Sequence, residues 1–178
     1  YSSLGVLDQS FGENGVATVG WRDGVTAVDL SIVGDGVIVA GHYTNWATHD
    51  PSGKQFCIDI KAYGFTNIMS MQYTMNWDPT ALTFQKIDNI QLKDLSSNGF
   101  GTTRTQEGKL GTAWYDMDVQ SITVEDGTSL YQVCFQATGK PETESRIFFS
   151  GDPVAIEVSN KEGQIISLAS RRATIRIQ

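Results

Sequence analysis

The sequence predicts an all-β protein folded as an antiparallel β-sandwich, and three observations support this fold class. Polar and apolar residues alternate strictly between Ser70 and Trp77, which is the pattern of a strand with one buried side. Elsewhere, apolar residues form short runs separated by turn-forming glycine, asparagine and aspartate residues. No segment carries a sustained helical stripe, and 178 residues suffice for one ordinary domain with a small appendage. The apolar face of the clearest strand comprises Met71, Tyr73, Met75 and Trp77.

The sequence pattern of residues 1–43 predicts a small β-meander that extends the sandwich at its N-terminus. Its apolar runs are interrupted by the turn-forming residues Gly34, Asp35 and Gly36. Residues 44–54 are polar, contain Pro51 within a turn sequence, and are interpreted as a linker. The strands expected in the extension cover Val16–Val19, Val25–Val33 and Val37–Ala40.

Residues 55–178 predict the sandwich itself. Pro79 cannot donate a hydrogen bond to a neighbouring strand, so the chain is expected to turn there before Leu82 and Phe84 re-enter the core. After a long irregular stretch, Trp114 and Tyr115 are expected to begin another strand. Further strands are expected at Phe56–Ala62, Leu130–Ala137, Ile147–Phe149, Ala155–Val158, Ile165–Leu168 and Ala173–Ile177, with a hairpin turn at Asn160–Gly163.

The two cysteines are predicted to form a disulfide. Cys57 shares the outward side of its strand with Asp59 and Lys61, and Cys134 lies on the outward side of its own strand. This placement favours a cross-strand bond over two buried thiols, and two independent thiols are the alternative. Such a bond would contribute roughly 4 kcal/mol in the chain-entropy model. A disulfide would place the protein in the extracellular space or the periplasm.

The charge balance excludes several partners. A net charge of −7 repels nucleic acid and anionic membrane surfaces, and no basic patch offsets it. No apolar run approaches the roughly 20 residues that a membrane-spanning helix needs.

No catalytic constellation stands out, and the sequence predicts a protein that is not an enzyme, needs no cofactor and has no metal site. His42 and His49 are interpreted as solvated loop histidines in preference to zinc ligands. Asp116 and Asp118 could share a face suited to calcium, but a solvated acidic edge is the favoured interpretation because calcium needs six or more oxygens. A glycosidase-type pair of carboxylates stays an open alternative, because the spacing of two residues in the sequence does not fix their distance in a sandwich.

The four tryptophans divide into two groups. Trp77 and Trp114 lie in strand patterns and are expected in the core. Trp21 and Trp46 lie outside these patterns and are candidates for a binding surface. They would either stack on sugar rings or anchor a protein contact, where tryptophan is an enriched residue.

Two stretches of the chain resemble known families. Phe56–Phe84, with the run N-W-D-P-x-x-L-x-F, and Glu125–Gly139 resemble the cohesin-like modules of bacterial extracellular proteins. The resemblance implies a jelly-roll sandwich of about nine strands that serves as a docking, adhesive or spacer unit. Leu7–Val16 and Asp35–Gly41 resemble one unit of the delta-sixty repeat of large bacterial surface proteins. A solitary unit must pack on the sandwich or be completed by another molecule.

The leading hypothesis is an extracellular structural or adhesive subunit that assembles with copies of itself into a surface fibre through its N-terminal strands, because unpaired strands are templates for pairing between molecules. The alternative is a monomeric module that binds carbohydrate or a dockerin-type protein. Hydrolysis is the weakest hypothesis, because no nucleophile and base are visible. The residues expected to mediate assembly are Val25, Val28, Leu30, Ile32, Val37, Ile38 and Val39.

Overall fold

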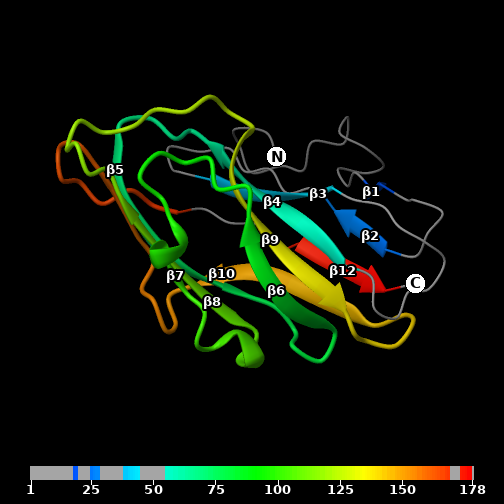
Figure 1. Ribbon diagram of the computed structural model, residues 1–178. Helices are drawn as coiled ribbons and strands as arrows, with labels where there is room; N and C mark the ends of the chain where they lie inside the picture. Colours follow the sequence, from blue (N-terminus) through cyan, green and yellow to red (C-terminus); the bar gives the residue numbers. More distant parts are fainter. Residues whose placement is uncertain (1–17, 20–24, 29–37, 45–54, 169–172, 178) are drawn as a thin grey trace.

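The described residues form two antiparallel β-sheets packed face to face (Figure 1). The computed structural model describes residues 18–19, 25–28, 38–44, 55–168 and 173–177. One buried apolar cluster contains side chains from both sheets, as the all-β sandwich prediction requires. Two short 3₁₀-helices, η1 (Ser97–Gly99) and η2 (Thr105–Glu107), flank strand β7.

The smaller sheet has four strands in the order β3-β4-β9-β6. Alternation in its central pair puts Phe56 and Ile58 into the core, and Phe56 lies opposite Phe135 of the neighbouring strand. Cys57 and Cys134 form the next pair of opposite residues, on the other side of the sheet. The strands are β3 (Ile38–Thr44), β4 (Gln55–Tyr63), β9 (Thr128–Ala137) and β6 (Leu82–Asp88).

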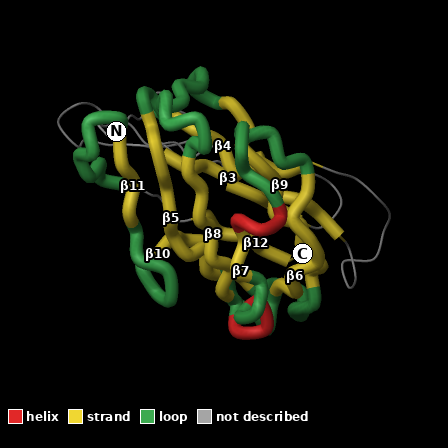
Figure 2. The backbone as a smooth tube through the Cα atoms, turned by 60° about the vertical axis from the view of Figure 1, so that its left-hand side comes forward, coloured by secondary structure: helices red, strands yellow, loops and turns green. Residues whose placement is uncertain are grey.

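The larger sheet has eight strands, and β5 lies at its centre. Strands β10 and β11 follow one another along the same edge of β5, and β8 pairs with the opposite edge (Figure 2). The main path runs β1-β2-β12-β10-β5-β8-β7. The strands are β1 (Thr18–Val19), β2 (Val25–Val28), β12 (Ala173–Ile177), β10 (Glu144–Ser150), β11 (Glu157–Asn160), β5 (Ile68–Asn76), β8 (Lys109–Tyr115) and β7 (Phe100–Gly101).

The predicted alternation of β5 is confirmed on its inner face and modified on its outer face. The whole predicted apolar face, ending at Trp77, is buried. Thr74 and Asn76 on the opposite face are also buried. The chain between β10 and β11 contacts Thr74, and the Asn76 side-chain amide donates to the Ser150 hydroxyl at the end of β10 (2.9 Å). The Thr74 hydroxyl donates to the Val154 carbonyl oxygen (3.2 Å) and accepts from the Val154 N–H (2.9 Å). Half of the outer face of β5 is therefore covered by the protein itself.

A buried network of hydroxyl groups joins the two sheets inside the core. The hydroxyl oxygens of Tyr73 and Tyr131 lie 2.7 Å apart, and the Tyr131 oxygen lies 3.1 Å from the Thr112 hydroxyl oxygen. Burial raises the pKa of Tyr131 to about 12, so its phenol stays neutral at physiological pH. A neutral, fully bonded network is compatible with an apolar core.

Tyr131→Phe is expected to lower the free energy of unfolding by about 2 kcal/mol. The substitution removes both hydrogen bonds, so the buried hydroxyls of Tyr73 and Thr112 each lose the Tyr131 hydroxyl as a partner. Tyr73→Phe is expected to cost about 1 kcal/mol, since the bond between Tyr131 and Thr112 survives. Urea titration of both variants measures the difference. Equal losses from the two variants would contradict the central position of Tyr131 in the network.

Two predicted strand positions are wrong. Trp114 and Tyr115 end strand β8 and do not begin one, because the small residues Gly111 and Ala113 belong to the strand. Residues 165–168 form no strand, and Ile165 makes only an isolated bridge to Ser159. The predicted turn at Asn160–Gly163 is present, since the Gly163 N–H donates to the Asn160 carbonyl oxygen (3.0 Å).

The described N-terminal strands pair within the chain. Strand β2 lies between β1 and β12, and β3 pairs with β4 along its whole length. Of the residues expected to mediate assembly, Val25 and Val28 belong to β2, and Ile38 and Val39 belong to β3. Whether they also contact another copy stays a prediction, as do the boundaries of the extension and the linker. Leu30, Ile32 and Val37 lie outside the described residues.

Among the described residues, no helix is both long and apolar enough to cross a membrane.

Candidate functional site

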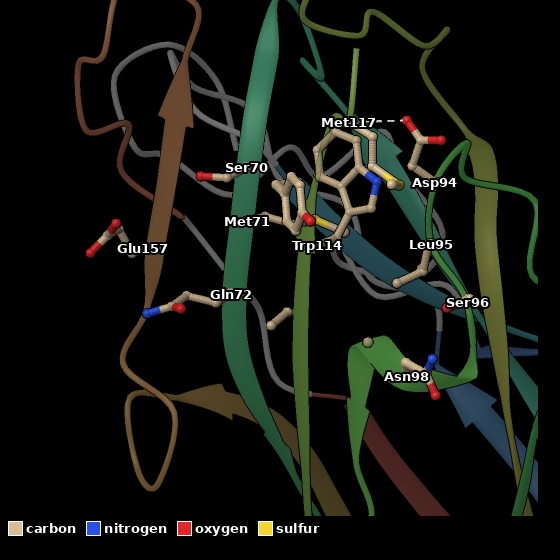
Figure 3. Close-up of a pocket in the computed structure, with 13 residues that line it drawn as sticks. Ser70, Met71, Gln72, Asp94, Leu95, Ser96, Asn98, Trp114, Met117 and Glu157 are labelled. Carbon is tan, nitrogen blue, oxygen red and sulfur yellow. Dashed lines mark hydrogen bonds between the residues drawn. The ribbon is translucent and has the colours of Figure 1, made fainter. Parts of the chain in front are cut away.

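A groove of about 460 Å³ lies on the outer face of the larger sheet, over β5 and β8. Figure 3 shows Ser70, Gln72 and Glu157 on one side of it and Leu95 and Asn98 on the other. The groove thus extends between β11 and the loop that precedes β7. Its full lining is Ser70, Met71, Gln72, Asp94, Leu95, Ser96, Asn98, Gly99, Ala113, Trp114, Tyr115, Met117 and Glu157.

Local sequence explains why the sheet is hollow here. Ala113 projects only a methyl group outward from β8, so the floor of the groove is low. The loop forms a wall because Gly99 lets it pass close to β8. A Cβ atom at Gly99 would lie 2.7 Å from the Ala113 carbonyl oxygen and 2.7 Å from Leu95 Cδ1. A larger residue at position 99 would therefore push the wall away from the sheet.

Exposed apolar side chains gather at one end of the groove. Tyr115 is 64% exposed, Met117 is 63% exposed, and both line the groove. Val119, also 63% exposed, follows two residues later. Single exposed apolar residues are ordinary, but a group of them beside a concave surface is typical of a binding site. Methionine suits such a surface because its flexible thioether adapts to its partner.

An ion-pair cluster lies beside this apolar end. The Lys93 ammonium group lies 3.6 Å from an Asp94 oxygen and 3.4 Å from an Asp116 oxygen, and it also contacts Asp118. Asp116 is buried, and its second oxygen accepts hydrogen bonds of 2.8 Å from the N–H groups of Gln120 and Ser121. The carboxylate therefore closes the turn that follows β8.

The charges of this cluster are mutually stabilised. Partial desolvation works toward a higher pKa for the Asp116 carboxyl, but hydrogen bonds from Gln120, Lys93 and Ser121 outweigh it and lower the pKa below its ordinary value. The hydrogen bond to Asp118 is the largest influence on the pKa of Lys93 and raises it well above the ordinary value. Both groups consequently stay ionised at neutral pH.

At the position considered for calcium, the structure shows carboxylates around a lysine ammonium group. One carboxylate oxygen from each of Asp94, Asp116 and Asp118 lies within 4.8 Å of the other two. The Lys93 ammonium group lies among them, so a cation of the protein already neutralises part of their charge. The expectation of a solvated acidic edge holds for the exposed Asp118 and is wrong for Asp116, because the turn after β8 encloses its carboxylate.

The predicted disulfide is present between Cys57 and Cys134, whose Cα atoms lie 3.9 Å apart. Both residues keep the predicted outward parity, but Cys134 is only 2% exposed. Its strand is central, and Cys57 and Lys86 lie opposite it on the two neighbouring strands, so flanking side chains cover it. The bond belongs to the smaller sheet, on the other side of the sandwich from the groove.

The predicted aromatic and histidine sites have mixed outcomes. Trp77 and Trp114 are buried as expected, and Trp114 also lines the groove. Trp21 and Trp46, the candidates for a binding surface, lie outside the described residues, and so does His49. The expectation of a loop at His42 is wrong, because His42 belongs to strand β3 and pairs with Asp59 of β4.

Sequence reasoning did not find the groove. A signal was present, since Tyr115, Met117 and Val119 repeat apolar residues at every second position beyond the buried Trp114. The wall of the groove formed by the loop before β7 comes from residues 94–99, whose sequence has no strand or helix periodicity that could have predicted it.

Comparison with known proteins supports the fold. A scan against protein-family models finds no match, and a search of curated proteins likewise finds none. Among solved structures, CaCohA2 from Clostridium acetobutylicum has 14% identity and a TM-score of 0.60, covering 80% of this chain and 91% of its own.

A non-cellulosomal cohesin from the archaeon Archaeoglobus fulgidus has 18% identity and a TM-score of 0.57, covering 80% of this chain and 90% of its own. A type I cohesin–dockerin complex from Clostridium thermocellum contains a chain with 10% identity and a TM-score of 0.56, covering 77% of this chain and 95% of that one. The architecture is therefore a cohesin-like β-sandwich. The delta-sixty-like unit expected at residues 7–41 stays a prediction.

Proposed function

We propose that this chain is an extracellular protein-binding module that docks a dockerin-type partner in the groove over β5 and β8. The observation that carries the proposal is the pairing of Tyr115 and Met117, two exposed apolar side chains, with a concave surface of about 460 Å³. Exposed aromatic and methionine side chains are enriched where proteins meet. Among the solved neighbours, a Clostridium thermocellum cohesin is described in complex with a dockerin, which supports a protein as the ligand.

The other features of the chain are compatible with this role. The Cys57–Cys134 disulfide supports an oxidising location, and hence a cell-surface or secreted protein. The proposed role is binding without catalysis, and it invokes no cofactor.

Self-assembly into a fibre has less support than binding of a different protein. The hypothesis relied on unpaired N-terminal strands. The described part of β2 is paired on both edges within its own chain, whereas β3 is an edge strand that pairs with β4. Two copies that each carry a net charge of −7 would also repel one another. A partner that brings basic side chains would instead be attracted toward this chain.

The double variant Tyr115→Ala/Met117→Ala is expected to weaken partner binding about 30-fold, which corresponds to about 2 kcal/mol. The loss arises because truncation removes the apolar contacts at the end of the groove. The measurement is biolayer interferometry of the wild-type chain and the variant against an immobilised panel of dockerin modules. The wild-type chain is expected to bind at least one of them.

The matched control is Ile165→Ala, because Ile165 is equally exposed but does not line the groove. This variant is expected to bind like the wild-type chain. If the wild-type chain binds a panel member and the double variant binds it equally well, the partner docks elsewhere. If no panel member binds, the dockerin assignment is wrong.

A further inference from the structure

A single lysine side chain links the two segments that form one end of the groove. Lys93 precedes the wall at residues 94–99, and Asp116 and Asp118 belong to the segment that follows β8. The Lys93 ammonium group contacts both of these carboxylates and also that of its neighbour Asp94. Its position resembles that of a bound cation, but the cation is part of the chain.

The backbone around Lys93 connects this cluster directly to the groove. The Trp114 indole N–H donates to the Lys93 carbonyl oxygen (2.7 Å). The Met117 N–H donates to the Asp94 carboxylate (3.1 Å), as Figure 3 shows. Trp114 and Met117 both line the groove, so a shift at Lys93 reaches its apolar end through two hydrogen bonds.

The backbone of these two segments depends on side-chain contacts to keep its conformation. Asp94, Val119 and Ser121 have positive φ angles of 63°, 56° and 69°, a conformation that residues other than glycine adopt at a cost. Such backbone persists only where surrounding contacts fix it. Here the contacts come from the ion-pair cluster and from the hydrogen bonds that Asp116 accepts.

We propose that Lys93 is the positioning residue of the groove: an internal cation that joins the wall at residues 94–99 to the segment after β8 and so fixes Met117 and Trp114. The structural part stands on the geometry alone, and the consequence for binding rests on the proposed function. Without the ammonium group, the three carboxylates, each of which has one oxygen within 4.8 Å of the others, would repel one another and separate the two segments.

The test compares three variants of the full chain by two-dimensional NMR, with no partner present. Lys93→Met keeps the length of the side chain and removes its charge, whereas Lys93→Arg keeps the charge. Lys86→Met is the control, because Lys86 forms an exposed ion pair with Asp88 on the other sheet. The signals observed are the Trp114 indole N–H and the backbone N–H groups of Met117, Gln120 and Ser121.

In Lys93→Met we expect the four signals to shift and their hydrogen exchange to accelerate about tenfold. The reason is that their acceptors, the Asp94 and Asp116 carboxylates and the backbone carbonyl oxygen of residue 93, lose their fixed position. We expect Lys93→Arg to restore the wild-type signals and Lys86→Met to leave them unchanged, since a single exposed ion pair contributes little. Wild-type signals in Lys93→Met, or no rescue by Lys93→Arg, would overturn the proposal.

If Lys93→Met does not fold, Asp118→Asn replaces it, because this exposed carboxylate can lose its charge without disturbing the buried Asp116. The Trp114 indole signal is then expected to shift from its wild-type position, and an unshifted signal would overturn the proposal. Because no partner is present, a negative result here is separate from a failure of the proposed function, which the dockerin panel detects.

Discussion

Gly108→Ala is expected to lower the free energy of unfolding by about 3 to 5 kcal/mol. Gly108 ends η2 with a positive φ angle of 73°, which disfavours any side chain. An added Cβ atom would lie 2.2 Å from the Trp77 carbonyl oxygen and 2.9 Å from Pro79 Cδ. Both neighbours are rigid, because one is backbone and the other belongs to a proline ring.

This close approach has a structural purpose. The Trp77 N–H donates to the Gly108 carbonyl oxygen (3.0 Å), so Gly108 attaches the loop before β8 to the end of β5. Displacing it disturbs the start of β8 and the packing of Trp77, which is 4% exposed. Urea unfolding monitored by tryptophan fluorescence measures the loss.

Gly163 offers a matched control for this prediction. It has the same φ angle of 73°, but an added Cβ atom would meet nothing within 4 Å. Gly163→Ala is therefore expected to cost only the backbone strain of about 1 kcal/mol. If the two variants lose the same stability, the contact between Gly108 and Trp77 does not constrain the fold and the larger estimate is wrong.

The same glycines show why parts of the fold could not be predicted from the sequence. Gly108 and Gly111 suggest a loop when only local propensity is considered, yet Gly111 belongs to β8. A Cβ atom at Gly111 would lie 2.9 Å from a Val154 methyl carbon. The need for glycine thus comes from a contact 43 residues away along the chain, between positions 111 and 154. Periodicity cannot reveal such a contact.

The inner face of the sandwich was predictable for the opposite reason. Strand β5 alternates between polar and apolar residues because one of its faces is buried against the other sheet. This burial requires an apolar residue at every second position, which is visible in the sequence. The pairing of Cys57 with Cys134 was predictable from parity, since both lie on outward faces of strands with clear patterns. What parity missed is that Thr74 on an outward face is covered by a distant segment.

The candidate site was the least predictable part, because it is assembled from segments that lack a shared pattern. Asp116 was predicted as a solvated residue beside Asp118, since neither the turn it closes nor its contact with Lys93 is visible in sequence spacing. The groove likewise depends on Gly99 and Ala113 meeting in space. Both features follow from tertiary packing and not from propensity.

Removing the disulfide with Cys57→Ala/Cys134→Ala is expected to lower the free energy of unfolding by about 4 kcal/mol. The bond joins residues separated by 77 positions, so it strongly restricts the unfolded chain. Since a domain is typically stable by only about 5 to 15 kcal/mol, this loss is a large share of the total. Urea titration of the double variant and of the oxidised wild-type chain measures it.

Reduced wild-type protein should match the double variant, because both lose the same constraint; stability within about 1 kcal/mol of the oxidised protein would contradict the predicted contribution. The disulfide and the groove lie on opposite faces of the sandwich, so the folded fraction of the double variant should bind any partner found in the dockerin panel with the affinity of the wild-type chain. Weakened binding by the folded protein would mean that the smaller sheet shapes the groove. Unchanged binding would separate the two functions of the sheets, with one stabilising the fold and the other presenting the docking surface.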